Sequence, residues 1–463
     1  MAPLKIVVAG ASGFVGRALV EKLARTHEVI GLTRSKHLPP PSSSPGVPGL
    51  RWMSCELFSL LQVEEALAGA DVAFYLVHSM LPHAHLVQGS FADFDLILAD
   101  NFARAAKQLG VKHVIYLGGL VPEGGELSPH LRSRLEVEET FRARGLPFTA
   151  VRASIVIGPS SSSFRIVERL VKRLPVMITP GWTLTPTQPI ALADVVELLE
   201  RVVLDPEAIG RVADVGGPDV LSYRELIQRT GVALGRPRRT IPISLLTPKL
   251  SKLWVSMVTQ TPMALVSPLV ESLRLPMVVR DDWLLRKSAR RMTPMSEALA
   301  ASIAVARSES PASSHSGKHR FDRDVRSVQR FVLPRGLRAR DVSEEYFRWL
   351  GTLSFVDVRV SGQTHQLFVK GFPRAILELS RSVERSSADR ELLYLTGGLL
   401  SRPTERPRGR FEFREVLGGK FILAAIHSFM PRLPWQLYKY SQALVHLNVM
   451  RRFGEHLETL NSA

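Results

Sequence analysis

The sequence has 463 residues, a hydrophobic fraction of 45% and a formal net charge of +17. This length predicts two or more domains, each large enough for its own hydrophobic core, and the single cysteine, Cys55, excludes a disulfide framework and a cysteine-based metal site. The net charge is −1 over residues 1–228, +10 over 229–320 and +8 over 321–463, which argues against a uniformly basic nucleic-acid binder. We therefore expect no nucleic-acid partner and no metal centre.

Residues 1–220 alternate between strand-like and helix-like segments, and this spacing predicts an α/β fold with a Rossmann-like, doubly wound parallel sheet. The predicted strands cover residues 5–9, 28–32, 71–77, 114–117 and 148–157. The predicted helices cover residues 63–68, 94–109, 131–143 and 164–174. No secretory leader precedes the first strand, so we expect a cytoplasmic protein.

The first strand is followed by a glycine-rich turn, Gly10-Ala11-Ser12-Gly13-Phe14-Val15-Gly16, and a helical run follows the turn directly. A strand, such a turn and a helix together form a cradle for a pyrophosphate, because the helix N-terminus presents N–H groups and a favourable dipole. The first glycine permits the tight turn, the second lets the backbone approach the phosphates, and the third lets the helix pack closely. The predicted cofactor contacts here are Gly10, Ser12, Gly13, Phe14, Val15 and Gly16.

The segment 241–279 is apolar but interrupted by prolines, which makes it a poor membrane span. Its apolar residues and the basic excess around it are compatible with contact to an anionic membrane surface. We favour a substrate-side subdomain, over about 220–304, whose apolar residues pack against the sheet.

Residues 305–320 are rich in Ser and charge and are predicted to form a linker. Beyond it, over 321–463, consecutive strands precede one long helix, which predicts an α+β domain with an antiparallel sheet. The predicted strands are 355–360, 366–369, 375–380, 392–396, 409–416 and 420–427, and the helix is 435–460.

Further motifs accompany the glycine turn: VAFYLVHS (72–79), VKHVIYLGG (111–119), HLRSRLEVEE (130–139), VRASIVIGP (151–159) and PIALADVVELL (189–199). With them, residues 1–304 resemble an atypical, extended-type short-chain dehydrogenase/reductase of the NmrA-like, NAD(P)H-binding group. Residues 321–463, with RSVQRF, EEYFRWL, GRFEFREVLGGKF and MPRLPWQLYKYSQALVH, resemble an uncharacterised domain fused behind such Rossmann domains. That resemblance implies a helix-grip-like fold, whose relatives enclose apolar ligands.

The resemblance also implies where catalytic residues would stand. Catalytic members use a Ser, a Tyr and a Lys four residues after the Tyr. The Ser position falls on Gly118 or Gly119, the Tyr position on His130 and the Lys position on Arg134. Arg134 can still hold a ribose but cannot exchange protons near neutrality, whereas His130 is either a general acid or a solvated residue at a helix start.

Cofactor selectivity is indicated by Arg34, which follows the second strand where NAD-selective proteins carry an acidic residue. A cation there suits a 2′-phosphate, so NADP is favoured, with NAD as the alternative. The resemblance places Glu56 and Leu57 beside the adenine, and Val77 and His78 along the cofactor trough.

Two functional hypotheses remain open. One is an NAD(P)-dependent oxidoreductase acting on an apolar small molecule, lipid- or quinone-like, without the usual Ser-Tyr-Lys set. The other is a non-catalytic NAD(P)-dependent sensor or scaffold, with lipid-like ligand binding at a membrane surface as a variant. The sequence alone does not name the substrate, the direction of reaction or the oligomeric state.

Overall fold

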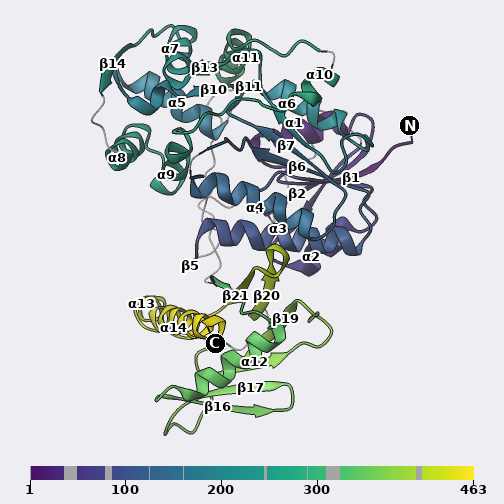
Figure 1. Cartoon of the computed structure of the whole chain (residues 1–463), viewed down its shortest axis with the longest axis vertical. Coiled ribbons are helices and arrows are strands. Elements are labelled where there is room, and N and C mark those ends of the chain that lie inside the picture. The colour runs from purple at the N-terminus through teal and green to yellow at the C-terminus, as the bar shows by residue number, and fades with distance from the viewer. Residues whose placement is uncertain are drawn as a thin grey trace. The chain divides into compact units, whose positions relative to one another are not determined.

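The computed structural model describes residues 2–35, 49–78, 86–124, 126–159, 161–243, 248–288, 290–308, 324–402 and 409–462. The chain divides into two compact units (Figure 1). Unit 1 comprises Met1–Met80 and Leu98–His315, and unit 2 comprises Leu81–Ile97 and Ser316–Ala463.

Unit 1 is built on a seven-stranded sheet in the order β12-β7-β6-β4-β1-β2-β3. The strands are β1 (Lys5–Ala9), β2 (Glu28–Thr33), β3 (Leu50–Ser54), β4 (Val72–Tyr75), β6 (His113–Gly119), β7 (Phe148–Ala153) and β12 (Val212–Val215). Every pairing among them is parallel. The strand order reverses between β1 and β4, where a crevice opens at the carboxyl ends of the strands in doubly wound sheets. The predicted Rossmann-like parallel sheet is confirmed.

Helices cover both faces of this sheet (Figure 1). They are α1 (Phe14–Leu23), α2 (Leu60–Leu67), α3 (Phe91–Gln108), α4 (Pro129–Ala143) and α6 (Leu192–Arg201), while α5 (Ser162–Arg173) and α7 (Tyr223–Ala233) pack on each other beyond the sheet. The strands form near-continuous apolar runs because both of their faces are buried. One core cluster joins β1, α1, β4 and α6, and it includes Leu19, Phe74 and Leu198.

The predicted strand over 148–157 is divided in the structure. β7 ends at Ala153, and a separate short strand, β8 (Val156–Ile157), pairs with β11 (Ile190–Ala191). The Ser154 hydroxyl donates to the Gln188 carbonyl oxygen at 2.5 Å, and the Ile190 amide donates to the Ile155 carbonyl oxygen at 3.0 Å. These bonds draw the chain away from the main sheet, which is why the strand does not continue.

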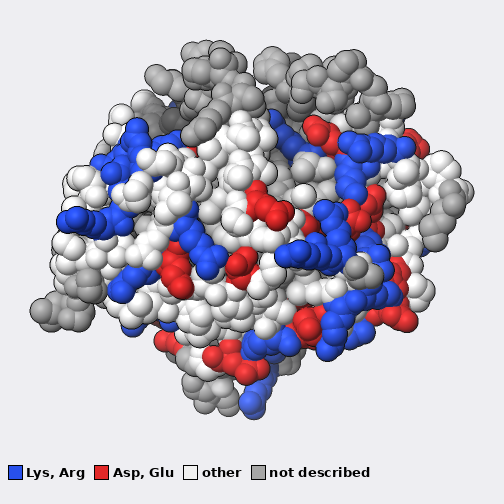
Figure 2. Space-filling model, turned by 90° about the horizontal axis from the view of Figure 1, so that it is seen from above, with Lys and Arg blue, Asp and Glu red and all other residues white. Residues whose placement is uncertain are grey.

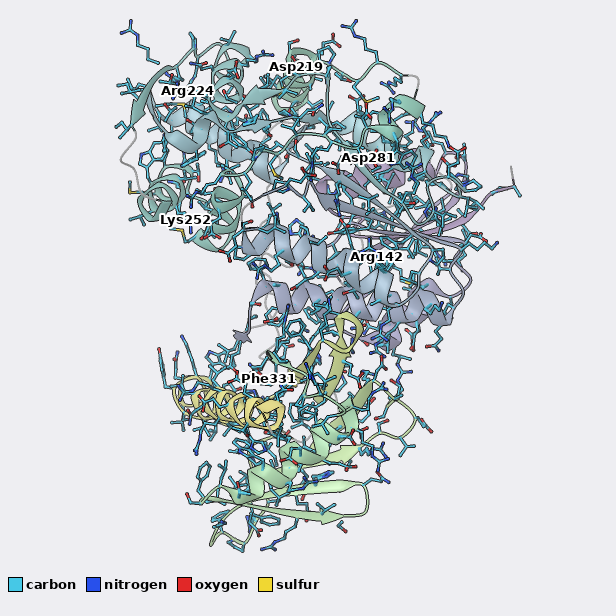
Figure 3. The ribbon with its side chains drawn as sticks, in the orientation of Figure 1. Arg142, Asp219, Arg224, Lys252, Asp281 and Phe331 are labelled. Carbon is cyan, nitrogen blue, oxygen red and sulfur yellow. The ribbon has the colours of Figure 1, made fainter. Side chains whose placement is uncertain are left out.

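Beyond residue 220 the chain adds short elements at the carboxyl side of the main sheet. They are β13 (Leu221–Ser222), β14 (Arg239–Ile243), α8 (Pro248–Thr259), α9 (Met263–Ser272), α10 (Trp283–Lys287) and α11 (Met295–Ser308), with β9 (Val176–Pro180), β10 (Pro186–Thr187) and η1 (Gly181–Leu184) pairing or packing among them. Asp219, labelled in Figure 3, accepts a 2.7 Å hydrogen bond from the Met295 amide and thereby fixes the start of α11.

α8 and α9 pack on α5 through one apolar face, which contains Val255, Val266 and Val270. Lys252, labelled in Figure 3, pairs with Glu271 and ties the two helices together. These residues pack on helices and not on the main sheet as expected, and a substrate-side subdomain over about 220–304 stays a prediction. Leu253 and Met257 of α8 are exposed, and membrane contact of this segment stays a prediction. Among the described residues, no helix combines the length and the apolarity that crossing a bilayer would require.

Unit 2 contains an eight-stranded sheet in the order β16-β17-β18-β19-β20-β21-β15-β5. The strands are β5 (Leu86–Gln88), β15 (Val325–Val332), β16 (Val356–Ser361), β17 (Thr364–Val369), β18 (Leu377–Arg381), β19 (Arg390–Gly397), β20 (Arg410–Val416) and β21 (Phe421–Phe429). The helices are α12 (Ala339–Thr352), α13 (Trp435–Tyr440) and α14 (Gln442–Ser462), with a short turn, η2 (Leu417–Gly419), between β20 and β21. The predicted α+β fold is confirmed, and each of the six predicted strands overlaps one of β16–β21.

Two features of unit 2 differ from the prediction. The long helix breaks at Ser441, whose φ of −127° and ψ of −86° are not helical. The sheet also begins earlier in the chain than expected, because β15 and β5 pair in parallel, with Leu86 opposite Val325. Residues 81–97 therefore belong to unit 2, although they precede most of unit 1 in sequence. The predicted division of the chain at 305–320 assigned them to the first domain. Of that predicted linker, residues 305–308 are helical and the rest lie outside the described residues.

Candidate functional site

The glycine turn has the conformation that a pyrophosphate cradle needs. Gly10 has a φ of +87°, and a Cβ there would lie 2.9 Å from the Leu76 carbonyl oxygen. The Gly13 amide donates to the Gly10 carbonyl oxygen at 2.9 Å. A Cβ on Gly16 would lie 2.2 Å from the same oxygen, so only glycine lets α1 begin this close to the turn.

The N-terminus of α1 suits an anion. Within the described residues, no side chain caps this helix at Gly13, and its first turn holds no acidic residue. The first N–H groups of a helix are not used within it and carry the positive end of its dipole. A phosphate group can therefore accept these hydrogen bonds, and the residues present fit a dinucleotide.

A cavity of about 360 Å³ opens beside the turn. One end is lined by the glycine turn and the ends of β4 and β6, and the other by apolar residues of α5, α9 and the segment after α9. Among its lining residues are Gly10, Gly13, Phe14, Val15, Gly16, Leu76, His78, Gly118, Gly119, His130, Arg134, Ile166, Val270 and Met277. It therefore extends from the cofactor turn into an apolar chamber.

Arg134 and His130 both line this cavity, and both come from the start of α4. Ser128 caps that helix by accepting from the Leu131 amide at 3.3 Å. Arg134 is 5% exposed, and its Nη1 donates to the Val77 carbonyl oxygen at 3.2 Å. The cation is thus held beside the carboxyl end of β4, at the switch point of the sheet.

The two glycines at the serine position are not equivalent. A Cβ on Gly118 would lie 2.9 Å from Cε1 of the buried Tyr116 ring, whereas one on Gly119 would meet nothing closer than 3.7 Å. Tyr116 itself is fully buried, and its hydroxyl donates to the Arg134 carbonyl oxygen at 3.1 Å. Its ring is part of the core, against Phe141 and Tyr75, and it does not replace the missing catalytic tyrosine.

Several predicted cofactor residues do not line the cavity: Ser12, Arg34, Glu56, Leu57 and Val77. Arg34 is exposed just after β2, a position compatible with contact to the outer end of a dinucleotide. The Leu57 carbonyl oxygen accepts from Asn101 Nδ2 at 2.9 Å, and the Glu56 carboxylate accepts from the Phe58 amide at 3.4 Å. These bonds order the loop after β3.

The substrate side is formed by residues that the sequence patterns did not single out. Ser154 and Tyr223 line the cavity, and so does Ser272, whose hydroxyl lies 2.9 Å from that of Ser128. Burial raises the pKa of Tyr223 to about 12, so this phenol keeps its proton. Ser154 lies within the motif VRASIVIGP, but no local pattern joins it to Tyr223 and Ser272, because three separate elements contribute them.

Gly158 and Gln188, which follow β8 and β10, do not line the cavity and have a structural role. A Cβ on Gly158 would lie 2.8 Å from the Phe14 ring. Gln188 Nε2 donates to the Gly217 carbonyl oxygen at 2.8 Å, and its Oε1 accepts from the Val279 amide at 2.9 Å. The segment after α9 is further held because Arg280 pairs with Glu123 and donates to the Val121 carbonyl oxygen. Gln188 thus fixes the wall of the cavity without lining it.

The charge on the face shown in Figure 2 is mixed. Lys and Arg gather in separate clusters with Asp and Glu between them. Opposite charges interspersed in this way keep the local potential low.

Fold and site together define a dinucleotide-binding Rossmann domain. Residues 10–174 match a family model described as NAD(P)H-binding, so this part of the chain carries an NAD(P)H-binding domain.

Individual proteins support this assignment. The chain is 28% identical over 185 residues to the auxiliary protein GraX of Staphylococcus aureus, covering 39% of this chain and 54% of GraX. It is 26% identical over 270 residues to the 2-alkyl-3-oxoalkanoate reductase of Stenotrophomonas maltophilia, covering 53% of this chain and 80% of the reductase. The structure of Citrobacter triphenylmethane reductase complexed with NADP(H) matches with a TM-score of 0.51 at 17% identity, over 64% of this chain and 98% of that one.

The matched region spans only about half of the length of GraX. At 17% identity the structural likeness shows the fold alone. The resemblance of residues 321–463 to a helix-grip-like domain stays a prediction.

Proposed function

We propose that unit 1 is an NADPH-dependent oxidoreductase that reduces a small, mainly apolar molecule of quinone-like chemistry. The observation that carries this proposal is the single cavity of about 360 Å³, which joins the glycine turn to the apolar side chains of α5 and α9. A cofactor that is bound only as a structural element needs no such chamber beside it. Binding pockets of enzymes combine an apolar wall with a few converging polar groups in this way.

Different residues of unit 1 bind different parts of the cofactor. The N–H groups at the start of α1 bind the pyrophosphate. Arg134, which lies on α4 beside the end of β4, holds the ribose. Arg34, exposed after β2, pairs with a 2′-phosphate. NADPH, when bound, supplies a hydride to the substrate.

His130 is the residue that we assign to proton transfer. It lies at the start of α4 and lines the same cavity as Arg134. Imidazole titrates near neutral pH and can donate a proton to a substrate oxygen and regain it from solvent. A quinone suits this site, because its reduced oxygen is phenolate-like and needs less help from a proton donor than an alkoxide does. Per turnover the substrate gains one hydride and one proton.

The test is NADPH oxidation by the purified full chain over a panel of quinones, with aliphatic ketones for comparison. We expect turnover with at least one quinone and a drop of about 10²-fold or more in kcat for His130→Gln. Arg132→Gln is the matched control, because Arg132 lies on α4, is exposed and pairs only with Glu126 among the described residues. If the activity of His130→Gln equals that of the wild type, His130 has no role in proton transfer.

A second candidate function is a non-catalytic sensor that binds NADP(H) without turnover. It is favoured by the packing of Gly118 on the Tyr116 ring, because that packing excludes the serine of the usual catalytic set at this position. NADPH binding without oxidation by any member of the panel would support this sensor and overturn the reductase.

A further inference from the structure

Unit 2 contains a second cavity, of about 150 Å³, enclosed between its sheet, α12 and α14. Its walls are mainly apolar and include Leu350, Leu367, Leu395, Ile426 and Phe429. Apolar cavities of about 150 Å³ in proteins accept a single benzene-sized ring. The cavity is therefore large enough for a small ring and too small for a long lipid chain.

The cavity has a mouth. Phe355 and Val445 both line it, and they are 44% and 54% exposed. Phe355 precedes β16 and Val445 lies on α14, so the cavity reaches the solvent at these two lining residues.

Two amide oxygens in the lining have no partner among the described residues. Gln88, only 8% exposed, donates from Nε2 to the Ala443 carbonyl oxygen at 3.0 Å. That bond fixes the orientation of the amide, because a carbonyl partner requires the NH₂ group. Its Oε1 is enclosed without a hydrogen bond in the described structure, and so is Oε1 of Gln442. A buried acceptor left without a donor is unfavourable, because no hydrogen bond offsets its desolvation.

The cavity is also electrically neutral. Its described lining residues include no Asp, Glu, Lys or Arg. Burial lowers the pKa of His446 to about 4, so this imidazole is uncharged at neutral pH, and it lies 3.1 Å from the Ser327 hydroxyl. The other polar lining residues, Ser327, Tyr346 and Tyr438, carry uncharged hydroxyl groups. An anionic ligand would therefore meet no cation, at a high cost of desolvation.

We propose that unit 2 is a binding site for a small, neutral, mainly apolar ring that carries a hydroxyl group, as a simple phenol does. The ring fills the apolar part of the cavity, and the hydroxyl donates to the oxygen of Gln88 or Gln442. Carboxylates of the same size are rejected, and rings without a donor bind more weakly. The site is distinct from the cofactor cavity and does not depend on the reaction proposed for unit 1.

Isothermal titration calorimetry of the full chain tests this with three probes of similar size: p-cresol, toluene and benzoate. We expect one p-cresol per chain, toluene about fivefold or more weaker, and no measurable benzoate binding. In Gln88→Leu the preference for p-cresol over toluene should disappear, with toluene binding kept. Gln442→Leu is a second variant for the same comparison, in case Gln88→Leu has a melting temperature too low for titration.

Leu444→Ala is the matched control, because Leu444 lies on α14, is 54% exposed and does not line the cavity; it should bind as the wild type does. Ile376→Trp fills the cavity and should abolish binding of both p-cresol and toluene. Equal affinity for p-cresol and toluene in the wild type, or an unchanged preference in both glutamine variants, would overturn the proposal. Absence of binding by a folded wild-type chain would overturn it as well.

Discussion

His113 gives unit 1 a pH dependence whose size follows from the structure. The side chain lies in β6 with 0% exposure, and its Nδ1 accepts from the Leu204 amide at 3.2 Å. Nε2 lies 2.8 Å from Oγ1 of Thr149, which itself donates to the Ala208 carbonyl oxygen at 2.6 Å. Nε2 is therefore the donor and Nδ1 the acceptor, so a second proton on Nδ1 would break the bond to Leu204.

Burial lowers the pKa of His113 from 6.5 to about 4. Because the folded-state pKa lies below that of the unfolded chain, the unfolded chain binds more protons between these two values, and stability falls as pH falls through this range. One pKa unit corresponds to about 1.4 kcal/mol. His113 should thus remove roughly 3 kcal/mol from the free energy of unfolding of unit 1 between pH 7 and pH 4.

The assay compares the wild type with His113→Gln, which cannot titrate. Hydrogen exchange of β6 peptides across a guanidinium titration reports the free energy of unfolding of unit 1 at each pH. The wild type should lose about 3 kcal/mol more than the variant on going from pH 7 to pH 4. His446→Gln, in unit 2, is the control and should leave this difference unchanged. Parallel pH curves for wild type and His113→Gln, within about 1 kcal/mol, would refute the reasoning.

Two further predictions concern the cofactor domain. Arg34→Glu should weaken NADPH binding at least tenfold and leave NADH binding within about threefold, because only NADPH carries the 2′-phosphate. Equal losses of affinity for both dinucleotides in parallel titrations would show that Arg34 does not determine cofactor selectivity. Gly118→Ala should destabilise unit 1 by about 1–3 kcal/mol in chemical denaturation, because its Cβ would lie 2.9 Å from the buried Tyr116 ring. Gly119→Ala should leave the free energy of unfolding nearly unchanged, because its Cβ would meet no atom closer than 3.7 Å. Equal stability of the two alanine variants would contradict the packing described here.

Much of unit 1 was predictable because its signals are local. A buried strand, the turn from Gly10 to Gly16 and the helix after it lie within one short stretch, so both the fold and the cofactor turn could be read from it. The positions of His130 and Arg134 beside this turn came from the resemblance, and the structure places both in the cavity. The order of the strands in the sheet depends on pairings between distant segments and has no such local signal.

The missed features depend on contacts distant in sequence. β5 has only three residues and becomes a strand because it pairs with β15, more than 230 residues later. Gln188 follows the short strand β10, but no local pattern shows that its amide bonds to Gly217 and Val279. Tyr223 and Ser272 reach the cavity from separate helices. The periodicity of 435–460 is continuous across Ser441, so nothing in it marks the break between α13 and α14.

The central claim, that the glycine turn of unit 1 binds NADPH, is tested most directly by titrating the full chain with NADPH and following the cofactor's fluorescence. We predict one NADPH per chain, with affinity reduced more than tenfold in Gly16→Ala, whose Cβ would lie 2.2 Å from the Gly10 carbonyl oxygen. Gly181→Ala is the control, because a Cβ at that position meets no described atom within 4 Å, and it should bind as the wild type does. No NADPH binding by the folded wild type, or equal binding by folded Gly16→Ala, would contradict the claim.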